Sequence, residues 1–320
     1  MIQTRKLGFD GPYITEVGLG TWAIGGSWQF GWGRQNIEES KKAIQQAIES
    51  GVNWIDTAPA YGLGLSESIV GDVLSHIKND IFVATKCGLL WNSSGKIKKY
   101  LDPQSIIKEC DDSLRRLKRD YIDLYQIHWP DENRSIEKSW ETMAKLKDSG
   151  KVRFIGVSNF SLEQLEKCEK IAHITSLQSP YSMLKRSVES EILNWCKDNQ
   201  TGFLAYSPLQ AGLLTGKFNK DYLHNLDAED WRKKNDLFKE PLFSQILQFV
   251  DSLKLTAKKI DQTVAGLAVA WVLQNLVVTS AIVGVRNEFQ ANKLKEGLNW
   301  KLSDLDLREI EANIVKYLSN

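Results

Sequence analysis

Three ionisable side chains stand at the ends of short β-branched runs of the sequence, and a fourth follows close behind. Asp56, Lys86 and His128 each end such a run, and Tyr61 lies in the segment after Asp56. A carboxylate, an ammonium, an imidazole and a phenol can together move a proton to or from an oxygen atom. These four residues are therefore the candidate catalytic group.

Tyr61 is the candidate proton donor, although a free phenol has a pKa near 10 and is a weak acid at neutral pH. We expect the ammonium of Lys86 to lower the pKa of Tyr61, because a nearby positive charge favours the phenolate. Asp56 supplies the counter-charge that a buried ammonium needs, and His128 is placed to hydrogen-bond a substrate oxygen. This machinery protonates an oxygen but supplies no electrons, so a carbonyl reduction would also need a hydride cofactor.

Each of these residues also has a simpler structural explanation when it is taken alone. Asp56 could cap the start of a helix, Lys86 could be a solvated strand end, and His128 could be a structural histidine. Their shared position at consecutive strand ends favours a common site over three unrelated roles.

The elements that would position these residues are short strands alternating with helices. The eight β-branched runs cover residues 16–20, 52–56, 81–86, 121–128, 152–158, 176–179, 202–207 and 280–284. Eight strands, most of them followed by helical spacing, predict an α/β fold that closes into a (β/α)8 TIM barrel, where active sites lie at the C-terminal strand ends. An open doubly wound sheet is the alternative.

Helical spacing is carried by seven sets of apolar residues. The sets are Ile37, Ile44 and Ile48; Ile106, Cys110, Leu114 and Leu117; Ile136, Trp140, Met143 and Leu146; Leu162, Leu165 and Cys168; Val188, Ile192 and Cys196; Val264, Leu267 and Trp271; and Leu307, Ile310, Ile314 and Tyr317. Residues 1–13 hold two glycines and a proline and predict a small β-hairpin. The charged segment 217–241, after strand seven, has no periodicity and is a candidate lid loop. We expect residues 1–320 to form a single domain.

Composition excludes several classes of protein. The chain has 320 residues, 42% of them hydrophobic and 25% charged, as in ordinary globular domains. A net charge of +1 argues against nucleic acid as a partner. The longest apolar run, 264–278, is interrupted by Gln274 and Asn275 and predicts a buried helix, so we expect no membrane partner. The segment 1–10 lacks the apolar core of a signal peptide, and the four cysteines form no C-x-x-C pair. These features predict a cytoplasmic location with reduced thiols.

Other motifs for cofactors and metals are absent or weak. The segment 18–23 fits G-x-G-x-x-G/A only loosely, and we expect no helix to open there, as a Rossmann site would require. The four histidines show no metal-ligand spacing, so no metal is predicted.

Four blocks of sequence carry a resemblance to a known family. They are GVNWIDTAPAYG at 51–62 with Ser66, Glu67 and Gly71 behind it, DSLRRL at 112–117 continuing through DYIDLYQIHWP at 120–130, KVRFIGVSNF at 151–160, and YSPLQAGLLTGK at 206–217. In this order, from about Arg5 to Leu298, the chain resembles the aldo-keto reductase superfamily. It looks most like the bacterial branches near the stress-response and inositol-operon reductases, and like the potassium-channel β-subunits.

This resemblance implies a (β/α)8 barrel that binds NADP(H) extended across its mouth. It places Asp56, Tyr61, Lys86 and His128 in a catalytic tetrad. It also implies a set of cofactor contacts. At the nicotinamide end, Ser158, Asn159 and Gln178 would hold the carboxamide, Tyr206 would stack on the ring, and Thr21, Trp22 and Asp56 would lie beside the cofactor. Further along, Ser207, Leu209 and Gly212 would line the pyrophosphate with Lys217 nearby, and Gly284, Arg286 and Gln290 would contact the adenosine end.

Arg286 would meet the 2′-phosphate of the cofactor, which favours NADPH over NADH because a guanidinium fork suits a phosphate dianion. The sequence departs from the family at Leu294, where the family often has Asn, so the adenine contact stays open.

The predicted mouth of the barrel is rich in aromatic residues. Trp22, Trp28, Phe30, Trp32, Trp91 and Trp129 fall in loops or at strand ends on that side. We expect the substrate to contact Trp22, Tyr61, Trp91, His128 and Trp129, although part of this aromatic set would simply pack the loops.

Three functions remain open at this point. The first is NADPH-dependent reduction of aldehydes, ketones or aldoses by hydride transfer, with Tyr61 as general acid. The second is an NADPH-binding regulatory protein, like the β-subunits, with slow turnover. The third is an isomerase or lyase barrel without a nicotinamide, which leaves Gln178, Tyr206 and Arg286 unexplained. A small carbonyl or sugar is the expected partner, and the sequence leaves open whether the chain forms a homo-oligomer.

Overall fold

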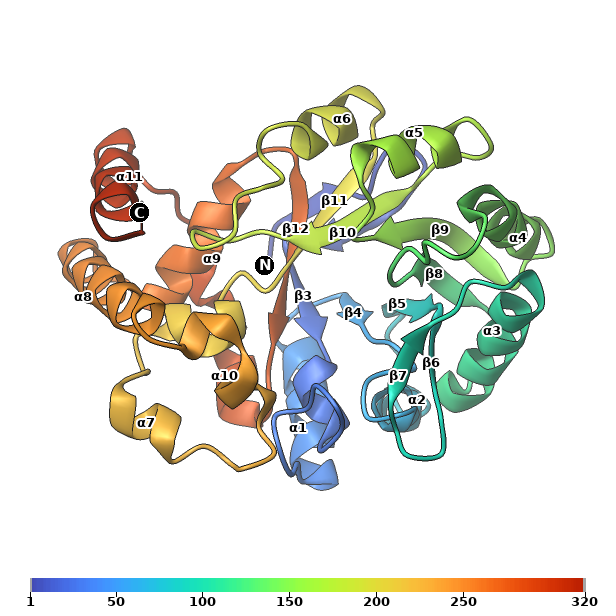
Figure 1. Cartoon of the computed structure of the whole chain (residues 1–320), viewed down its shortest axis with the longest axis horizontal. Coiled ribbons are helices and arrows are strands. Elements are labelled where there is room, and N and C mark those ends of the chain that lie inside the picture. The colour runs from blue at the N-terminus through green and yellow to red at the C-terminus, as the bar shows by residue number, and fades with distance from the viewer. Residues whose placement is uncertain (1, 319–320) are drawn as a thin grey trace.

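Eight parallel strands close into a barrel in the computed structural model, which describes residues 2–318 (Figure 1). Around the barrel the strand order is β10-β11-β12-β3-β4-β5-β8-β9. The strands are β3 (Val17–Gly20), β4 (Trp54–Asp56), β5 (Phe82–Cys87), β8 (Ile122–Ile127), β9 (Val152–Ser158), β10 (Ser176–Pro180), β11 (Gly202–Tyr206) and β12 (Val278–Gly284). The predicted (β/α)8 barrel is confirmed, and each strand falls within or next to its predicted run.

Most of the helices surround the barrel and pack on its outer face, while α7 lies at one end of it. They are α1 (Ile37–Glu49), α2 (Leu65–Leu74), α3 (Pro103–Leu117), α4 (Ile136–Asp148), α5 (Leu162–Glu169), α6 (Ile192–Asp198), α7 (Lys220–His224), α8 (Leu242–Lys259), α9 (Val264–Gln274), α10 (Glu288–Asn292) and α11 (Asp304–Leu318). Short 3₁₀ helices are η1 (Trp22–Gly25), η2 (Gln210–Thr215), η3 (Trp231–Lys234), η4 (Asp236–Phe238) and η5 (Lys293–Gly297).

Three details of the helices differ from the prediction. The apolar sets do not include α2, α7, α8 and α10, and α6 begins at Ile192 rather than at Val188. Helix α2 is missed because six of its ten residues are buried, so it lacks the polar face that makes helical periodicity visible. A single 3₁₀ turn, η1, also opens just after Gly20, where no helix is expected.

The barrel interior is filled by apolar side chains of the barrel strands, together with Leu7 and Ile14 from the N-terminal segment. They form one cluster of Leu7, Ile14, Trp54, Phe82, Ala84, Leu124, Leu204 and Ile282. Gly18 is required here, because a Cβ at that position would overlap the Trp54 indole. The outward-facing strand residues belong to a second, larger cluster shared with the helices. The interior is therefore a packed core, and a site can form only at its ends.

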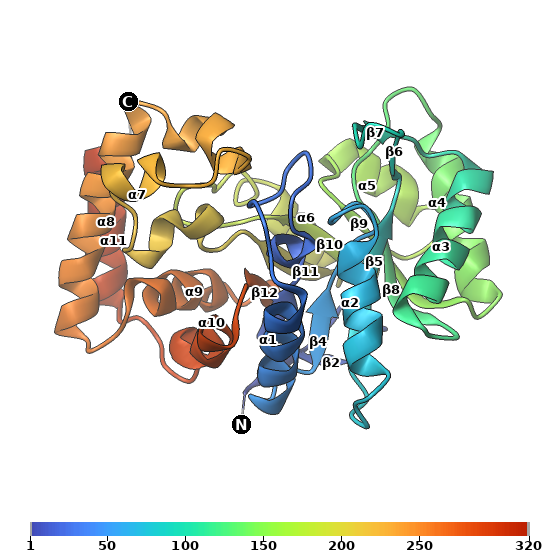
Figure 2. The same cartoon turned by 90° about the horizontal axis from the view of Figure 1, so that it is seen from below.

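The two ends of the barrel are covered differently. The predicted N-terminal hairpin is present as β1 (Thr4–Lys6) and β2 (Tyr13–Thr15), and Leu7 and Ile14 from it enter the interior cluster. At the opposite end lie α7 and a second hairpin, β6 (Leu89–Trp91) with β7 (Ile97–Lys99), as Figure 2 shows. The C-terminal ends of the strands are thus the open end.

The charged segment 217–241 is not a plain loop. It contains α7, η3 and η4, and within it Arg232 is buried and paired with Asp230 at 2.6 Å. Its role as a lid stays a prediction. Over residues 2–318, no helix combines the length and the apolar character needed to cross a membrane.

Candidate active site

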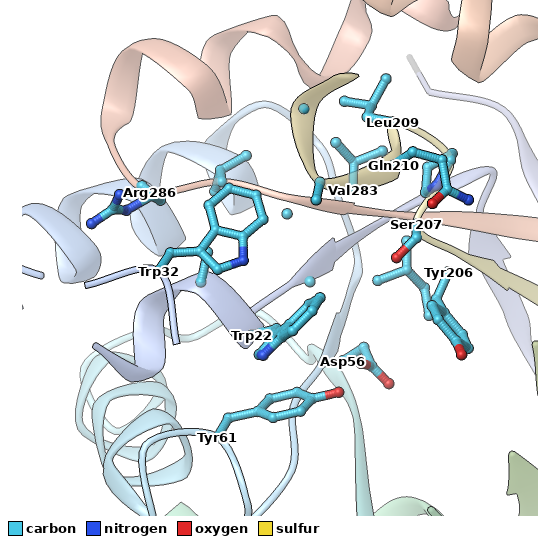
Figure 3. Close-up of a pocket in the computed structure, with 18 of the residues that line it drawn as sticks. Trp22, Trp32, Asp56, Tyr61, Tyr206, Ser207, Leu209, Gln210, Val283 and Arg286 are labelled. Atoms are coloured by element: carbon cyan, nitrogen blue, oxygen red, sulfur yellow. The ribbon is translucent and has the colours of Figure 1, made fainter. Parts of the chain in front are cut away.

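A cavity of about 780 Å³ opens at the C-terminal ends of the strands. Seven of the barrel strands contribute a residue to its lining, six of them at or just beyond the C-terminal end and Gln178 two residues before it: Gly20, Asp56, His128, Ser158, Gln178, Tyr206 and Gly284. Figure 3 shows the Tyr61 hydroxyl directed towards Asp56, with Arg286 at the far end of the pocket. The cavity is elongated, and the predicted catalytic group lies at one end of it.

Lys86 is buried at the floor of the site and makes its strongest contacts with Asp56. Its Nζ donates to both carboxylate oxygens of Asp56 at 2.7 Å, to the Thr57 carbonyl at 3.0 Å and to the Tyr61 Oη at 3.3 Å. Gln178 donates to the same carboxylate at 2.7 Å. The lysine side chain is 0% exposed, so this pair lies in a low-dielectric environment.

The pKa of Tyr61 moves in the direction opposite to the expected one. Burial raises the pKa of Tyr61 well above its usual value of 10.0, and the negative charge of Asp56 raises it further. Lys86 does not reverse this, because Asp56 neutralises its charge. Burial also lowers the pKa of Lys86, against the opposing effect of Asp56. The expectation of a lowered Tyr61 pKa is therefore wrong for the protein by itself.

His128 faces Tyr61 as a neutral imidazole. The two rings are 5.7 Å apart between centroids and nearly perpendicular. Burial lowers the pKa of His128 well below its usual value of 6.5, and the charge of Lys86 lowers it further. The backbone fixes this residue from both sides, since its N–H donates to the Cys87 carbonyl at 3.0 Å and its carbonyl accepts from Asn159 at 3.0 Å. A neutral ring can donate one hydrogen bond to a substrate oxygen.

The four residues predicted to hold a nicotinamide lie together next to this group. Asn159 Nδ2 donates to the Ser158 Oγ at 2.9 Å, and the Tyr206 hydroxyl donates to Asn159 Oδ1 at 2.8 Å. Asn159 has a φ of 63°, a left-handed conformation that Asn tolerates better than most residues. Gln178, Asn159 and Ser158 thus present amide and hydroxyl groups along one side of the cavity, beside the Tyr206 ring.

The loop after β11 supplies a second group of the predicted cofactor residues. Ser207, Gln210, Ala211 and Gly212 all have positive φ values, between 44° and 98°. Successive backbone N–H groups in such a turn form a concave surface that suits phosphate oxygens. Leu209 and Lys217 also line the cavity.

Arg286 marks the far end of the cavity. Its Nε donates to Gln35 Oε1 at 2.8 Å, its Nη2 donates to the Arg34 carbonyl at 2.7 Å, and its backbone N–H donates to Gln290 Oε1 at 2.8 Å. A smaller cavity of about 280 Å³ adjoins it, lined by Arg34, Arg232 and Arg286 together with Asp227 and Asp230. Leu294 lines the main cavity, so the position where the sequence departs from the family it resembles lies on the cavity wall.

The comparison with known proteins now decides the family. The model of the Aldo/keto reductase family matches residues 16–314. This chain belongs to the aldo/keto reductase family. The resemblance noted in the sequence is confirmed, and the protein is an oxidoreductase of a family that uses nicotinamide cofactors on small molecules.

Three similar proteins illustrate the range of this family. The chain is 38% identical over 313 residues to the aldo-keto reductase YhdN of Bacillus subtilis, covering 97% of this chain and 93% of that protein. It is 33% identical over 317 residues to the NADH-specific methylglyoxal reductase of Escherichia coli, covering 94% of each. The structure of glycerol dehydrogenase AKR11B4 from Gluconobacter oxydans superposes with a TM-score of 0.90 at 37% identity, covering 99% of this chain and 96% of that one.

Three predicted site residues of this aldo/keto reductase do not line the cavity: Lys86, which is fully buried against Asp56, and also Thr21 and Trp91. Thr21 is fully buried behind it, where its hydroxyl donates to the Asp56 carbonyl at 2.9 Å. Trp91 lies on β6 opposite Ile97, outside the set of lining residues. The cavity wall in this hairpin is made instead by Leu89, Ile97, Lys98 and Lys99. Trp22 and Trp129 do line the cavity, as expected.

Aromatic contacts between two distant segments roof the cavity of this aldo/keto reductase. The Trp22 ring lies 5.2 Å from that of Trp231 and 6.2 Å from that of Trp32, measured between centroids. The Arg232 guanidinium lies 4.2 Å from the centre of the Trp32 ring. Sequence reasoning misses Arg232 because its only local signal is a common Asp-Trp-Arg triplet, and its partner ring comes from the other end of the chain.

Proposed function

We propose that this protein reduces aldehydes, ketones or aldoses to alcohols with NADPH, reversibly, and with Tyr61 as the general acid. The observation that carries this proposal is the buried contact of Lys86 with Asp56 and Tyr61, with the Tyr61 and His128 side chains facing the cavity. That arrangement delivers one proton to an oxygen atom and excludes water from the transfer.

The residues along the cavity fit a nicotinamide dinucleotide. Amide and hydroxyl groups stand beside Tyr206, backbone N–H groups follow in the turn after Ser207, and Arg286 ends the cavity. When bound, NADPH supplies a hydride to the carbonyl carbon. We propose that Ser158, Asn159 and Gln178 hold its carboxamide and that Gln178 exchanges its bond with Asp56 for this contact.

The proton side of the reaction follows from the side chains of the chain itself. His128 donates a hydrogen bond to the carbonyl oxygen and orients it towards Tyr61. As negative charge develops on that oxygen, Tyr61 transfers its proton to it, and the product is a neutral alcohol. Lys86 stabilises the phenolate that remains, since its ammonium lies 3.3 Å away, and solvent returns the proton. The raised pKa of Tyr61 keeps the donor protonated before this step.

We propose NADPH rather than NADH as the preferred cofactor. The support is the Arg286 guanidinium, with that of Arg34 beside it around the small cavity at the far end; Arg232 also lines this cavity but is already paired with Asp230. An arginine fork binds a phosphate dianion in a bidentate manner, which a ribose hydroxyl cannot match.

We further propose that residues 1–320 act as one domain and that the protein is cytoplasmic. The strands of one closed barrel come from both halves of the chain. The four cysteines are buried and unpaired, as in a reducing compartment.

NADPH consumption with a panel of carbonyls tests the main proposal. The wild type and Tyr61→Phe are compared with methylglyoxal, aldoses, aryl aldehydes and a keto-steroid, and NADPH binding is followed separately by fluorescence. We expect turnover to fall by at least a hundredfold in Tyr61→Phe while NADPH binding persists. Tight binding without turnover of any carbonyl by the wild type would instead favour a regulatory role, and absence of NADPH binding would exclude both.

A further inference from the structure

The substrate end of the cavity is bounded by two segments that the barrel brings together. One is the loop after β3, with Trp28 and Phe30, and the other is the β6–β7 hairpin. Gln29 joins them, because its side-chain oxygen accepts the Ile97 backbone N–H at 2.8 Å. The Trp28 ring lies 6.1 Å from that of Tyr61, so this wall stands directly beside the proposed proton donor.

Positive charge gathers on this hairpin without a matching carboxylate. Lys98 and Lys99 line the cavity as solvent-exposed side chains, and within residues 2–318 neither forms an ion pair or a hydrogen bond. The Lys99 Nζ lies 5.4 Å from the centre of the Trp129 ring, next to His128 in the chain. The Lys98 Nζ lies 5.0 Å from the Tyr100 ring, which Arg134 also faces.

The acidic side chains of the cavity are already engaged elsewhere. In the described part of the chain, the carboxylates that line it belong to Asp56 and Glu296. Asp56 forms an ion pair with Lys86. Glu296 forms an ion pair with Lys293 at 2.6 Å within η5, which follows α10. No acid of the lining therefore compensates the two lysines at the substrate end.

One neutral donor at this end is also without a partner within the described residues. The indole N–H of Trp28 is buried and has no acceptor among residues 2–318. An unpaired buried donor costs free energy that a bound acceptor recovers. The ammonium groups of Lys98 and Lys99 and the indole N–H of Trp28 favour a ligand with negatively charged oxygen atoms. A phosphate monoester carries close to two negative charges on three such oxygens.

We propose that the substrate is an aldehyde bearing a phosphate ester, whose carbonyl lies at Tyr61 and His128 while its phosphate lies against Lys98 and Lys99. This inference rests on the proposed reductase function and narrows its substrate class. The phosphate takes no part in the chemistry: the hydride reaches the carbonyl carbon, the Tyr61 proton reaches its oxygen, and the ester leaves unchanged.

Steady-state kinetics with glyceraldehyde and glyceraldehyde 3-phosphate tests the inference, because the two compounds share the same reacting carbonyl. We expect the wild type to show a kcat/KM at least tenfold higher for the phosphate, mostly through KM, and this advantage to shrink as salt is added. Lys98→Met and Lys99→Met should each lower the ratio of the two kcat/KM values about fivefold, the upper range for a solvent-exposed charge pair.

The control is Lys96→Met, on the same hairpin but outside the cavity lining, which should leave that ratio unchanged. A second pair, butanal and 4-oxobutanoate, separates phosphate from carboxylate. The inference is overturned if glyceraldehyde is reduced as well as its phosphate, if neither lysine variant changes the ratio, or if the carboxylate brings the same gain as the phosphate. If no carbonyl is reduced at all, it is the reductase function that fails.

Discussion

Glu109 is a buried carboxyl group whose ionisation should set the pH dependence of stability. It lies on α3, where Oε2 accepts the Gly88 backbone N–H at 2.9 Å and Oε1 accepts the Ser105 hydroxyl at 3.0 Å. Burial raises the pKa of Glu109 from its usual value of 4.5 to about 7, against these hydrogen bonds, which lower it. Gly88 joins β5, which carries Lys86, to the β6–β7 hairpin. The Glu109 carboxyl group therefore holds the point at which this hairpin leaves the barrel.

The sign of the effect follows from proton binding in the two states. Between the unfolded and folded pKa values, the folded protein keeps the Glu109 proton and the unfolded chain does not, so the free energy of unfolding falls as pH rises. A pKa raised from 4.5 to about 7 corresponds to about 3 kcal/mol in total. About 2.5 kcal/mol of this should be lost between pH 5 and pH 9.

Urea unfolding of the wild type and Glu109→Gln across this pH range measures the effect. The amide cannot ionise, so the free energy of unfolding of the variant should gain about 2.5 kcal/mol on that of the wild type between pH 5 and pH 9. Glu166→Gln, an exposed position on α5, serves as the control and should follow the wild type at every pH. A difference between Glu109→Gln and the wild type that stays constant with pH would refute the reasoning.

Two further predictions concern the cofactor and the core. Arg286→Met should raise the KM for NADPH about tenfold, because a charge-assisted contact with the 2′-phosphate is lost, and should leave the KM for NADH little changed. Equal effects on the two KM values would contradict the assignment of Arg286 to the 2′-phosphate. Gly18→Ala should lower the free energy of unfolding by about 1–3 kcal/mol, because the new Cβ overlaps the Trp54 indole. Gly150→Ala serves as a comparison for backbone strain alone, because nothing lies within 4 Å of a Cβ at that position while its φ is positive. Thermal unfolding measures this pair, and a stability of Gly18→Ala equal to the wild type would show that the interior can repack.

Sequence periodicity is sufficient to predict the barrel because each strand is buried on both faces and each helix mostly on one. The ends of those strands then follow directly, which is why the sequence pattern alone groups Asp56, Lys86 and His128 at one site. Helix α2 escapes this reasoning because burial removes its polar face. Trp91 lies outside the cavity lining, and the sequence gives no sign of this because a hairpin residue beside the cavity wall has the same local character as one on it.

The amino-acid pattern establishes which strand carries each ionisable group, and therefore that these groups meet at one end of a barrel. Chain order and a period of two are local properties, and they need no knowledge of distant packing. The direction of the Tyr61 pKa, the raised pKa of Glu109 and the contact of Arg232 with Trp32 come only from the folded arrangement. Each of these depends on how far neighbouring segments exclude water or approach in space, and segments far apart in the sequence set that distance.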